Sequence, residues 1–64
     1  MLEVKSVRRL PTGMWRYELS DGEVYLVTEM FGWIFDRMLE PVPHPRVEEV
    51  QKAIVRWMLR DADV

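Results

Sequence analysis

The sequence contains no cysteine, which excludes disulfide bonds and thiolate metal sites. It contains one histidine, His44, so an ordinary zinc site with several imidazole ligands is excluded as well. The three glycines, at positions 13, 22 and 32, are too far apart to form a phosphate-binding loop. We therefore expect no bound metal and no cofactor.

The sequence also lacks a long apolar run, and we expect no secretory leader. No segment is long and apolar enough to span a membrane. The first residues do not show the basic-then-apolar layout of a signal peptide. Together with the lack of cysteine, these absences favour a cytoplasmic location.

Neither sign of charge dominates the chain. Nine Lys and Arg are interspersed with eleven Asp and Glu, for a net charge of −2, which gives no general electrostatic reason to expect nucleic acid. The 64 residues form one domain, residues 1–64. A domain this small buries only about 60% of its unfolded surface. We therefore expect the three Trp, two Tyr, two Phe and five Met to build a dense core, a partner interface or both.

Three segments alternate between apolar and polar residues and predict strands over about 2–10, 14–20 and 23–28. The turn sequences Pro11-Thr12-Gly13 and Asp21-Gly22 separate them. A two-residue loop at Asp21-Gly22 would place Leu19 opposite Val24 and Tyr17 opposite Leu26. This register predicts an apolar inner face that contains Trp15, Tyr17, Leu19, Val24 and Leu26.

The first hairpin is less regular, and two loop lengths are possible. An even-numbered loop at Thr12-Gly13 puts Leu2, Val4 and Leu10 on the inner face and Arg8 opposite Tyr17. An odd-numbered loop buries Val7 and exposes Leu2 and Val4, so we favour the even one. The predicted outer face then carries a modest apolar patch of Val7, Tyr25, Val27 and Met14.

The second half of the chain predicts two helices, over about 29–39 and 46–61. Thr28 is the expected N-cap of the first helix, whose apolar face would contain Met30, Phe31, Ile34, Phe35 and Met38. Prolines 41, 43 and 45 end this helix. The second helix has an apolar stripe of Val47, Val50, Ile54, Trp57 and Met58. The expected fold is α+β in the order βββαα: a three-stranded antiparallel meander whose inner face the two helices cover.

Several apolar residues remain outside this expected core, and they predict partner binding. Trp33 and Arg37 lie on the polar side of the first predicted helix, while Val55 and Leu59 lie one turn apart on the second. Trp33 has the alternative of lying over Arg37 or under the proline connector. Val55 and Leu59 have the alternative of touching the first helix. The predicted partner-binding residues are Trp33, Arg37, Val55, Leu59, Tyr25 and Val27.

The sequence offers little for catalysis. His44 lies between two prolines with no nucleophile near it in the chain, and a triad needs three convergent groups. Asp36 and Glu40 share a face of the first predicted helix, where Arg37 neutralises them and a solvated surface is the simpler interpretation. We therefore expect no enzymatic activity.

The leading hypothesis is a non-enzymatic protein–protein interaction module that self-associates, with a homodimer as the expected state. Small size and the lack of catalytic groups fit an inhibitor or accessory protein of a phage or mobile element, which occludes a larger partner. A structural subunit of a larger complex is a third reading. The alternative is a DNA- or RNA-binding regulator that uses Arg8, Arg9, Arg16, Lys52, Arg56 and Arg60.

Overall fold

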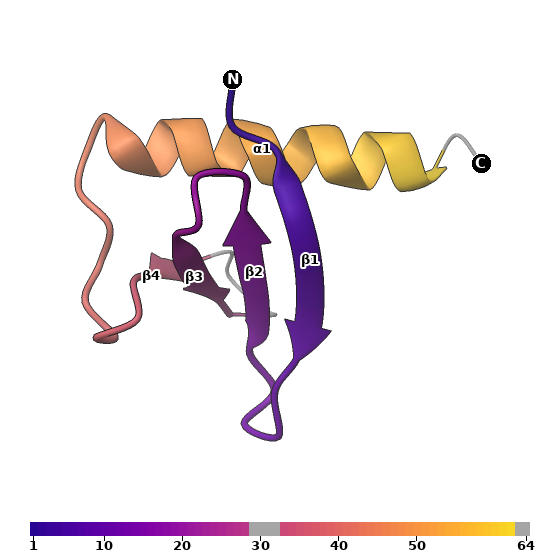
Figure 1. Ribbon diagram of the computed structural model, residues 1–64. Helices are drawn as coiled ribbons and strands as arrows, with labels where there is room; N and C mark the ends of the chain where they lie inside the picture. The colour runs from indigo at the N-terminus through magenta and orange to yellow at the C-terminus, as the bar shows by residue number, and fades with distance from the viewer. Residues whose placement is uncertain (29–32, 63–64) are drawn as a thin grey trace.

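In a computed structural model, which describes residues 1–28 and 33–62, a four-stranded antiparallel sheet is crossed by one helix. The strands are β1 (Val4–Arg9), β2 (Trp15–Leu19), β3 (Val24–Val27) and β4 (Ile34–Phe35), and the helix is α1 (Arg46–Ala62). The sheet order is β1-β2-β3-β4, and α1 runs across the end of the sheet where β1 begins and β2 ends (Figure 1). The α+β class, the meander and the C-terminal helix are confirmed.

The predicted helix over 29–39 is wrong where the structure describes it; residues 29–32 of that prediction lie outside the described residues. Ile34 and Phe35 instead form β4, which pairs with Val27 and Leu26 of β3. Thr28, the expected helix cap, closes this hairpin: its N–H donates to the Trp33 carbonyl at 3.0 Å, and its hydroxyl accepts the Trp33 N–H at 3.1 Å. Aromatic and β-branched residues suit a strand, so pairing with β3 outweighs the helical spacing of this segment.

The predicted register between the second and third strands is wrong by one residue. Tyr17 pairs with Tyr25, and Trp15 pairs with Val27. The turn holds three residues, because the Leu19 N–H donates to the Glu23 carbonyl at 2.9 Å, and Gly22 takes a φ of 87° there. A slip of one residue exchanges the two faces of a strand. Tyr25 and Val27, which we expected outside, therefore face α1, where Tyr25 is only 6% exposed.

A β-bulge resolves the irregular spacing of the first strand. Val4 pairs with Leu19 but Ser6 pairs with Glu18, so the register shifts at Lys5. The extra residue turns both Val4 and Val7 toward the core, although they lie three positions apart. Neither of the two loop lengths expected from the sequence places Val4 and Val7 on the same face of the sheet. The expected pairing of Arg8 with Tyr17 is also wrong, because Arg8 pairs with Arg16.

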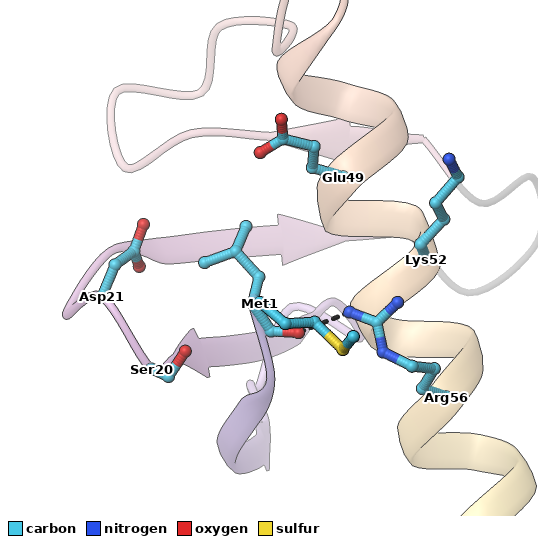
Figure 2. A pocket seen from close by; sticks show the side chains of 7 residues that line it. Met1, Ser20, Asp21, Glu49, Lys52 and Arg56 are labelled. Carbon is cyan, nitrogen blue, oxygen red and sulfur yellow. Dashed lines mark hydrogen bonds between the residues drawn. The ribbon is translucent and has the colours of Figure 1, made fainter.

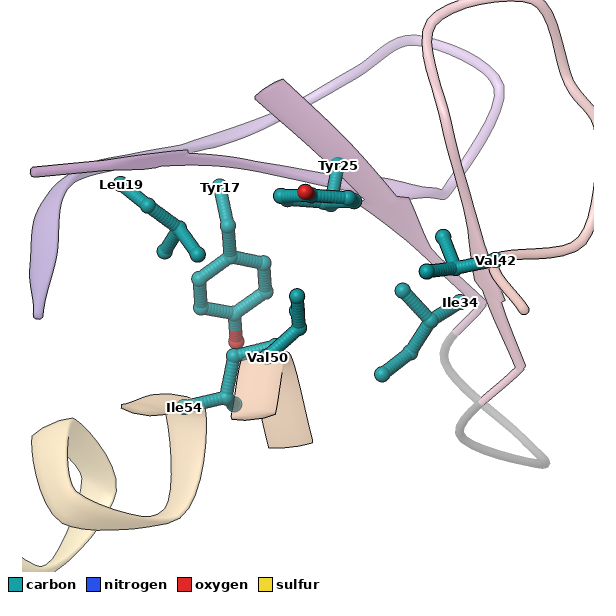
Figure 3. Close-up of a cluster of buried hydrophobic side chains, with 7 residues drawn as sticks. All are labelled: Tyr17, Leu19, Tyr25, Ile34, Val42, Val50 and Ile54. Atoms are coloured by element: carbon teal, nitrogen blue, oxygen red, sulfur yellow. The ribbon is translucent and has the colours of Figure 1, made fainter. Parts of the chain in front are cut away.

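The core lies between the inner face of the sheet and the first three turns of α1 (Figure 3). Leu19 is fully buried and Val50 of α1 is fully buried beside it. The Tyr17 ring points from β2 toward α1 and meets the Trp57 ring edge to face, with centroids 6.2 Å apart. Burial raises the pKa of the Tyr17 hydroxyl. The buried core cluster comprises Tyr17, Leu19, Tyr25, Ile34, Val42, Val50 and Ile54.

The two sheet edges are protected in different ways. At β4, the connector to α1 forms a bridge between Phe35 and Pro41, and the Val42 N–H donates to the Ile34 carbonyl at 3.3 Å. The opposite edge, β1, carries the bulge at Lys5 and two arginines at its end. Bulges and basic side chains both discourage the pairing of an edge strand with another chain. Pairing of β1 with a strand of another chain is therefore disfavoured. Any association would use contacts between side chains and not backbone pairing.

Helix α1 begins and ends close to the predicted bounds. Its N-terminal N–H groups are satisfied from the connector, since Val47 donates to the Pro43 carbonyl at 3.0 Å and Glu48 to the Pro45 carbonyl at 3.1 Å. Glu48 and Glu49 stand in the first turn and Arg60 in the last, which complements the helix dipole. Within the described part of the chain, no helix is long and apolar enough to cross a membrane.

Candidate interaction surface

An apolar groove opens where α1 leaves the sheet. Because the helix crosses only one end of the sheet (Figure 1), the inner face is not covered at the other end. The groove has a volume of about 370 Å³, and the edge-to-face pair of Tyr17 and Trp57 forms part of its wall. Its lining consists of Val7, Trp15, Tyr17, Val27, Thr28, Trp57 and Met58.

A strip of exposed apolar side chains, here called the helix seam, adjoins this groove. It consists of Val55, Met58 and Leu59, which are 51%, 51% and 62% exposed. Residues three and four apart share one side of a helix, so the three side chains form one surface. Met58 belongs to both the seam and the groove lining. The predicted exposure of Val55 and Leu59 is confirmed, and the structure adds Met58, which we expected on the buried stripe.

Trp33 and Arg37 are both exposed, as expected, but not on a helix. Trp33 is 59% exposed and directly precedes β4. Arg37 lies in the turn that follows β4. They therefore flank β4, one before it and one after it, and they are distant in sequence from the helix seam. Their role in partner binding remains a prediction.

The turn after β4, residues 36–40, was not foreseen as a surface. The Asp36 carboxylate accepts the Met38 N–H at 2.8 Å and the Glu40 N–H at 3.0 Å. Met38, expected in a buried helix face, is 80% exposed, and Leu39 is 61% exposed. Leu39 adopts a φ of 62°, a left-handed conformation that costs a residue with a side chain roughly 1–2 kcal/mol. Asp36 with Pro41 five residues on was the sequence signal for a turn here.

Tyr25 and Val27 do not form the outer patch that the sequence predicted. Tyr25 is buried, and its hydroxyl accepts a hydrogen bond from Arg46 Nε at 2.9 Å, so it offers no surface to a partner. Val27 packs against the core and lines the groove. Both belong to the inner face because of the register that the structure adopts.

Arg46 joins the helix to the turn between β2 and β3, a role that was not predicted from the sequence. Besides Tyr25, its guanidinium donates to the Asp21 carboxylate and to Glu49 Oε2 at 3.2 Å. A basic residue at the first position of a helix opposes the helix dipole, and this was the available signal that Arg46 serves a tertiary contact. The contact anchors the start of α1 and so sets how far the helix covers the sheet.

We expect the Asp21 contact to make stability depend on pH on the acid side. The hydrogen bond from the Glu23 N–H, and then Arg46, hold the pKa of Asp21 below its ordinary value of 3.8. A lowered pKa contributes stability that is present above pH 3.8 and is lost as pH falls through the folded-state value. The difference in urea midpoint between the wild type and Asp21→Asn should therefore shrink below about pH 4. A difference that grows on acidification contradicts this.

A second hollow, of about 540 Å³, lies between the N-terminus, the β2–β3 turn and α1 (Figure 2). Its charged residues are two acidic ones, Asp21 and Glu49, and two basic ones, Lys52 and Arg56. The Arg56 guanidinium donates to the Leu2 carbonyl, so it ties the N-terminal segment to the helix. The hollow therefore lies where the N-terminal segment is attached to α1. Because its lining contains charges of both signs, it does not select a ligand of either charge.

The six basic residues of the nucleic-acid alternative form two separate sets. Arg8 and Arg16 face each other across β1 and β2, and Arg9 lies over the Trp15 ring, 5.6 Å from its centroid. The second set is on α1: Lys52, Arg56 and Arg60. Since β1 has six residues and rises roughly 3.3 Å per residue, about 20 Å separates the two sets. Arg56 is bound to the Leu2 carbonyl, and Arg60 Nη2 lies 3.9 Å from Glu3 Oε1.

Among the described residues, no side chains are arranged as a catalytic site or a metal site. His44 is exposed, and its Nδ1 lies 3.9 Å from Glu48 Oε1. Asp36 and Glu40 are brought together by backbone bonds in a turn, not on a helix. Residues 1–28 and 33–62 contain no group of three His, Asp or Glu side chains placed to hold a metal ion. The chain matches no protein-family model, no curated protein and no solved structure.

Proposed function

We propose that this protein is a non-enzymatic protein-interaction module that self-associates through the helix seam and the adjoining groove. The carrying observation is that these two apolar surfaces are continuous at Met58. A helix with apolar residues on more than one side commonly contacts two surfaces. In α1, Val50 and Ile54 face the sheet, while Val55 and Leu59 face solvent. A second protein surface on the seam removes these side chains from water.

Thermodynamics supports the same proposal. A domain of this size is marginally stable when alone, and association adds stability because a partner binds the folded state only. The seam and groove together provide the contiguous apolar patch that marks protein interaction sites. Within this proposal, the function is to dock on a protein and occlude it, as an inhibitor or accessory protein of a phage or mobile element does.

The test is the association state of Val55→Asp with Leu59→Asp, measured by light scattering over a range of concentrations. We expect the wild type to be a dimer and the double variant to be a monomer that retains its helix content, because two buried carboxylates oppose association. The matched control is Lys52→Glu, which changes the net charge of the same helix by the same −2. We expect this control to remain a dimer. A wild type that is a monomer throughout, or a double variant that associates normally, refutes the proposal.

Nucleic-acid binding remains the alternative, and one observation favours it. Arg8 and Arg16 are cross-strand neighbours, and like charges directly opposite each other are unfavourable unless an anion lies near. Against it stand the net charge of −2 and the engagement of Arg56 and Arg60 within the chain. A salt titration separates the two functions, because phosphate contacts weaken steeply with salt and an apolar seam does not.

A further inference from the structure

The outer face of the sheet, which is turned away from α1, carries arginine and aromatic side chains. Tyr17 of β2 and Ile34 of β4 belong to the core that α1 covers. Because successive side chains of a strand point to opposite faces, their neighbours Arg16 and Phe35 point outward. We propose that this outer face binds single-stranded nucleic acid, with phosphates at the arginines and bases on the aromatic rings. The site is independent of the proposed function, since the helix seam and the groove lie on the α1 side of the sheet.

One transverse row of outward side chains crosses all four strands. Arg8 of β1 pairs with Arg16 of β2, and Arg16 pairs with Leu26 of β3. Leu26 in turn pairs with Phe35 of β4. Neighbouring strands are about 4.8 Å apart, so the row extends roughly 14 Å across the sheet. It is therefore basic at β1 and β2 and aromatic at β4.

Trp33 extends the aromatic end of this row. The Thr28 N–H donates to the Trp33 carbonyl at 3.0 Å, which continues the pairing of β3 with β4 beyond Val27 and Ile34. Trp33 is two positions before Phe35, so strand alternation puts both side chains on the outer face. Trp33 is 59% exposed and Phe35 is half-buried. Aromatic rings on an open sheet face are a stacking platform that proteins use for unpaired bases.

The two arginines indicate an anionic ligand. Like charges directly opposite each other in a sheet are destabilising, and Arg16 is half-buried, where an unpaired charge costs more than in water. Within residues 1–28 and 33–62, neither Arg8 nor Arg16 has a hydrogen-bond or ion-pair partner for its guanidinium. Phosphate oxygens would supply the missing acceptors, and guanidinium groups bind phosphate through paired hydrogen bonds.

The carboxylates near this face are already engaged. Glu18 is the one acidic residue that points outward from the four strands, and it lies 4.0 Å from Lys5 Nζ and accepts the Ser6 hydroxyl at 3.3 Å. Asp36, which follows Phe35, accepts the Met38 N–H through its carboxylate. The net charge of −2 is therefore not spread over the outer face, and its two free guanidinium groups leave it locally basic.

The aromatic half of the row distinguishes single-stranded nucleic acid from other polyanions. An acidic peptide would use Arg8 and Arg16 but has no planar group to place on Phe35 and Trp33. A duplex supplies phosphates, but its bases are stacked on one another and their faces are not accessible. An unpaired strand brings phosphates and exposed base faces together, so it alone uses both halves of the row.

The first experiment measures binding of a labelled oligothymidylate of about 12 nucleotides by fluorescence anisotropy. We expect Arg8→Gln with Arg16→Gln to weaken binding roughly tenfold or more, because two charge-assisted contacts are lost. The urea midpoint of this variant without ligand should be equal to or above that of the wild type, because the repulsion between the arginines is removed. A wild type that does not bind the oligonucleotide overturns the inference.

The matched control is Lys52→Gln with Arg60→Gln, which removes the same number of positive charges from α1. We expect it to bind the oligonucleotide as the wild type does. Equal losses in the two double variants would show that affinity follows overall charge and would overturn the assignment to the outer face. Light scattering on Arg8→Gln with Arg16→Gln should show the wild-type association state; weaker binding that comes only with dissociation likewise counts against this face.

The second experiment separates stacking from charge. Phe35→Leu and Trp33→Leu should each weaken binding about fivefold or more, the lower range for stacking of one base. Both should keep a slope of about −1.4 for log affinity against log salt, the value for two phosphates on a single strand. Circular dichroism checks the fold of Phe35→Leu, and the exposed Trp33 provides the second variant. Wild-type affinity in both variants, or equal competition by a duplex or by polyglutamate, contradicts the proposal.

Discussion

Replacing Leu19 by alanine is expected to lower the free energy of unfolding by about 2–5 kcal/mol, which is the range for large-to-small changes in a core. Leu19 is fully buried, and it pairs with Val4 at the point where the bulge of β1 begins. The fully buried Val50 belongs to the same core cluster, so the cavity would lie where the sheet and helix meet. Chemical denaturation followed by tryptophan fluorescence measures the loss.

The control for this prediction is Met38→Ala, which removes a side chain of similar size that is 80% exposed. We expect it to change the unfolding free energy by no more than about 0.5 kcal/mol. Both variants are compared with the wild type at one protein concentration, because self-association itself adds stability. A Leu19→Ala loss as small as that of Met38→Ala would show that β2 does not present Leu19 to the helix in the register described.

Replacing Arg46 by methionine is expected to lower the unfolding free energy by roughly 1–3 kcal/mol. Methionine keeps most of the apolar stem but removes the hydrogen bonds to Tyr25, Asp21 and Glu49. The partly exposed ion pairs add little by themselves, whereas the buried Tyr25 hydroxyl loses its donor. We expect a lower midpoint in urea and faster hydrogen exchange in the first turn of α1, because the helix start is no longer tied to the sheet.

Arg37→Met is the matched control for Arg46→Met, since Arg37 is an exposed arginine in the turn after β4. Its replacement should change stability by no more than about 0.5 kcal/mol. A second comparison, Tyr25→Phe, removes the hydroxyl that Arg46 binds and should reproduce part of the Arg46→Met loss. Equal stability of Arg46→Met and Arg37→Met would mean that the helix is held to the sheet by apolar packing alone.

Much of the fold was accessible from local sequence patterns. The alternation of Trp15, Tyr17 and Leu19 correctly predicted β2 and its buried face. The spacing of Val50 and Ile54 correctly predicted the buried side of α1. These patterns succeed because each depends on the geometry of one element, with a period of two for a strand and 3.6 for a helix.

The candidate surface was accessible only in part. The exposure of Val55 and Leu59 followed from their place on the helical wheel, and the structure confirms it. The groove beside them was not foreseen, because it depends on where α1 crosses the sheet. The exposure of Met38 and Leu39 was missed because their segment was interpreted as a helix. The apolar residues of this segment recur at helical spacing, although residues 34–40 form a strand and a turn.

The sequence by itself determined the class, the order of the first three strands, the C-terminal helix and the absence of cysteine-based chemistry. Tertiary structure alone decided the register that turns Tyr25 inward, the bulge that turns both Val4 and Val7 toward the core, and the fourth strand. The physical reason is that, for each of these features, the observed conformation and its alternatives have similar local energies. Contacts between distant segments select among them, by burying the larger apolar set and pairing the backbone groups of residues far apart in the chain.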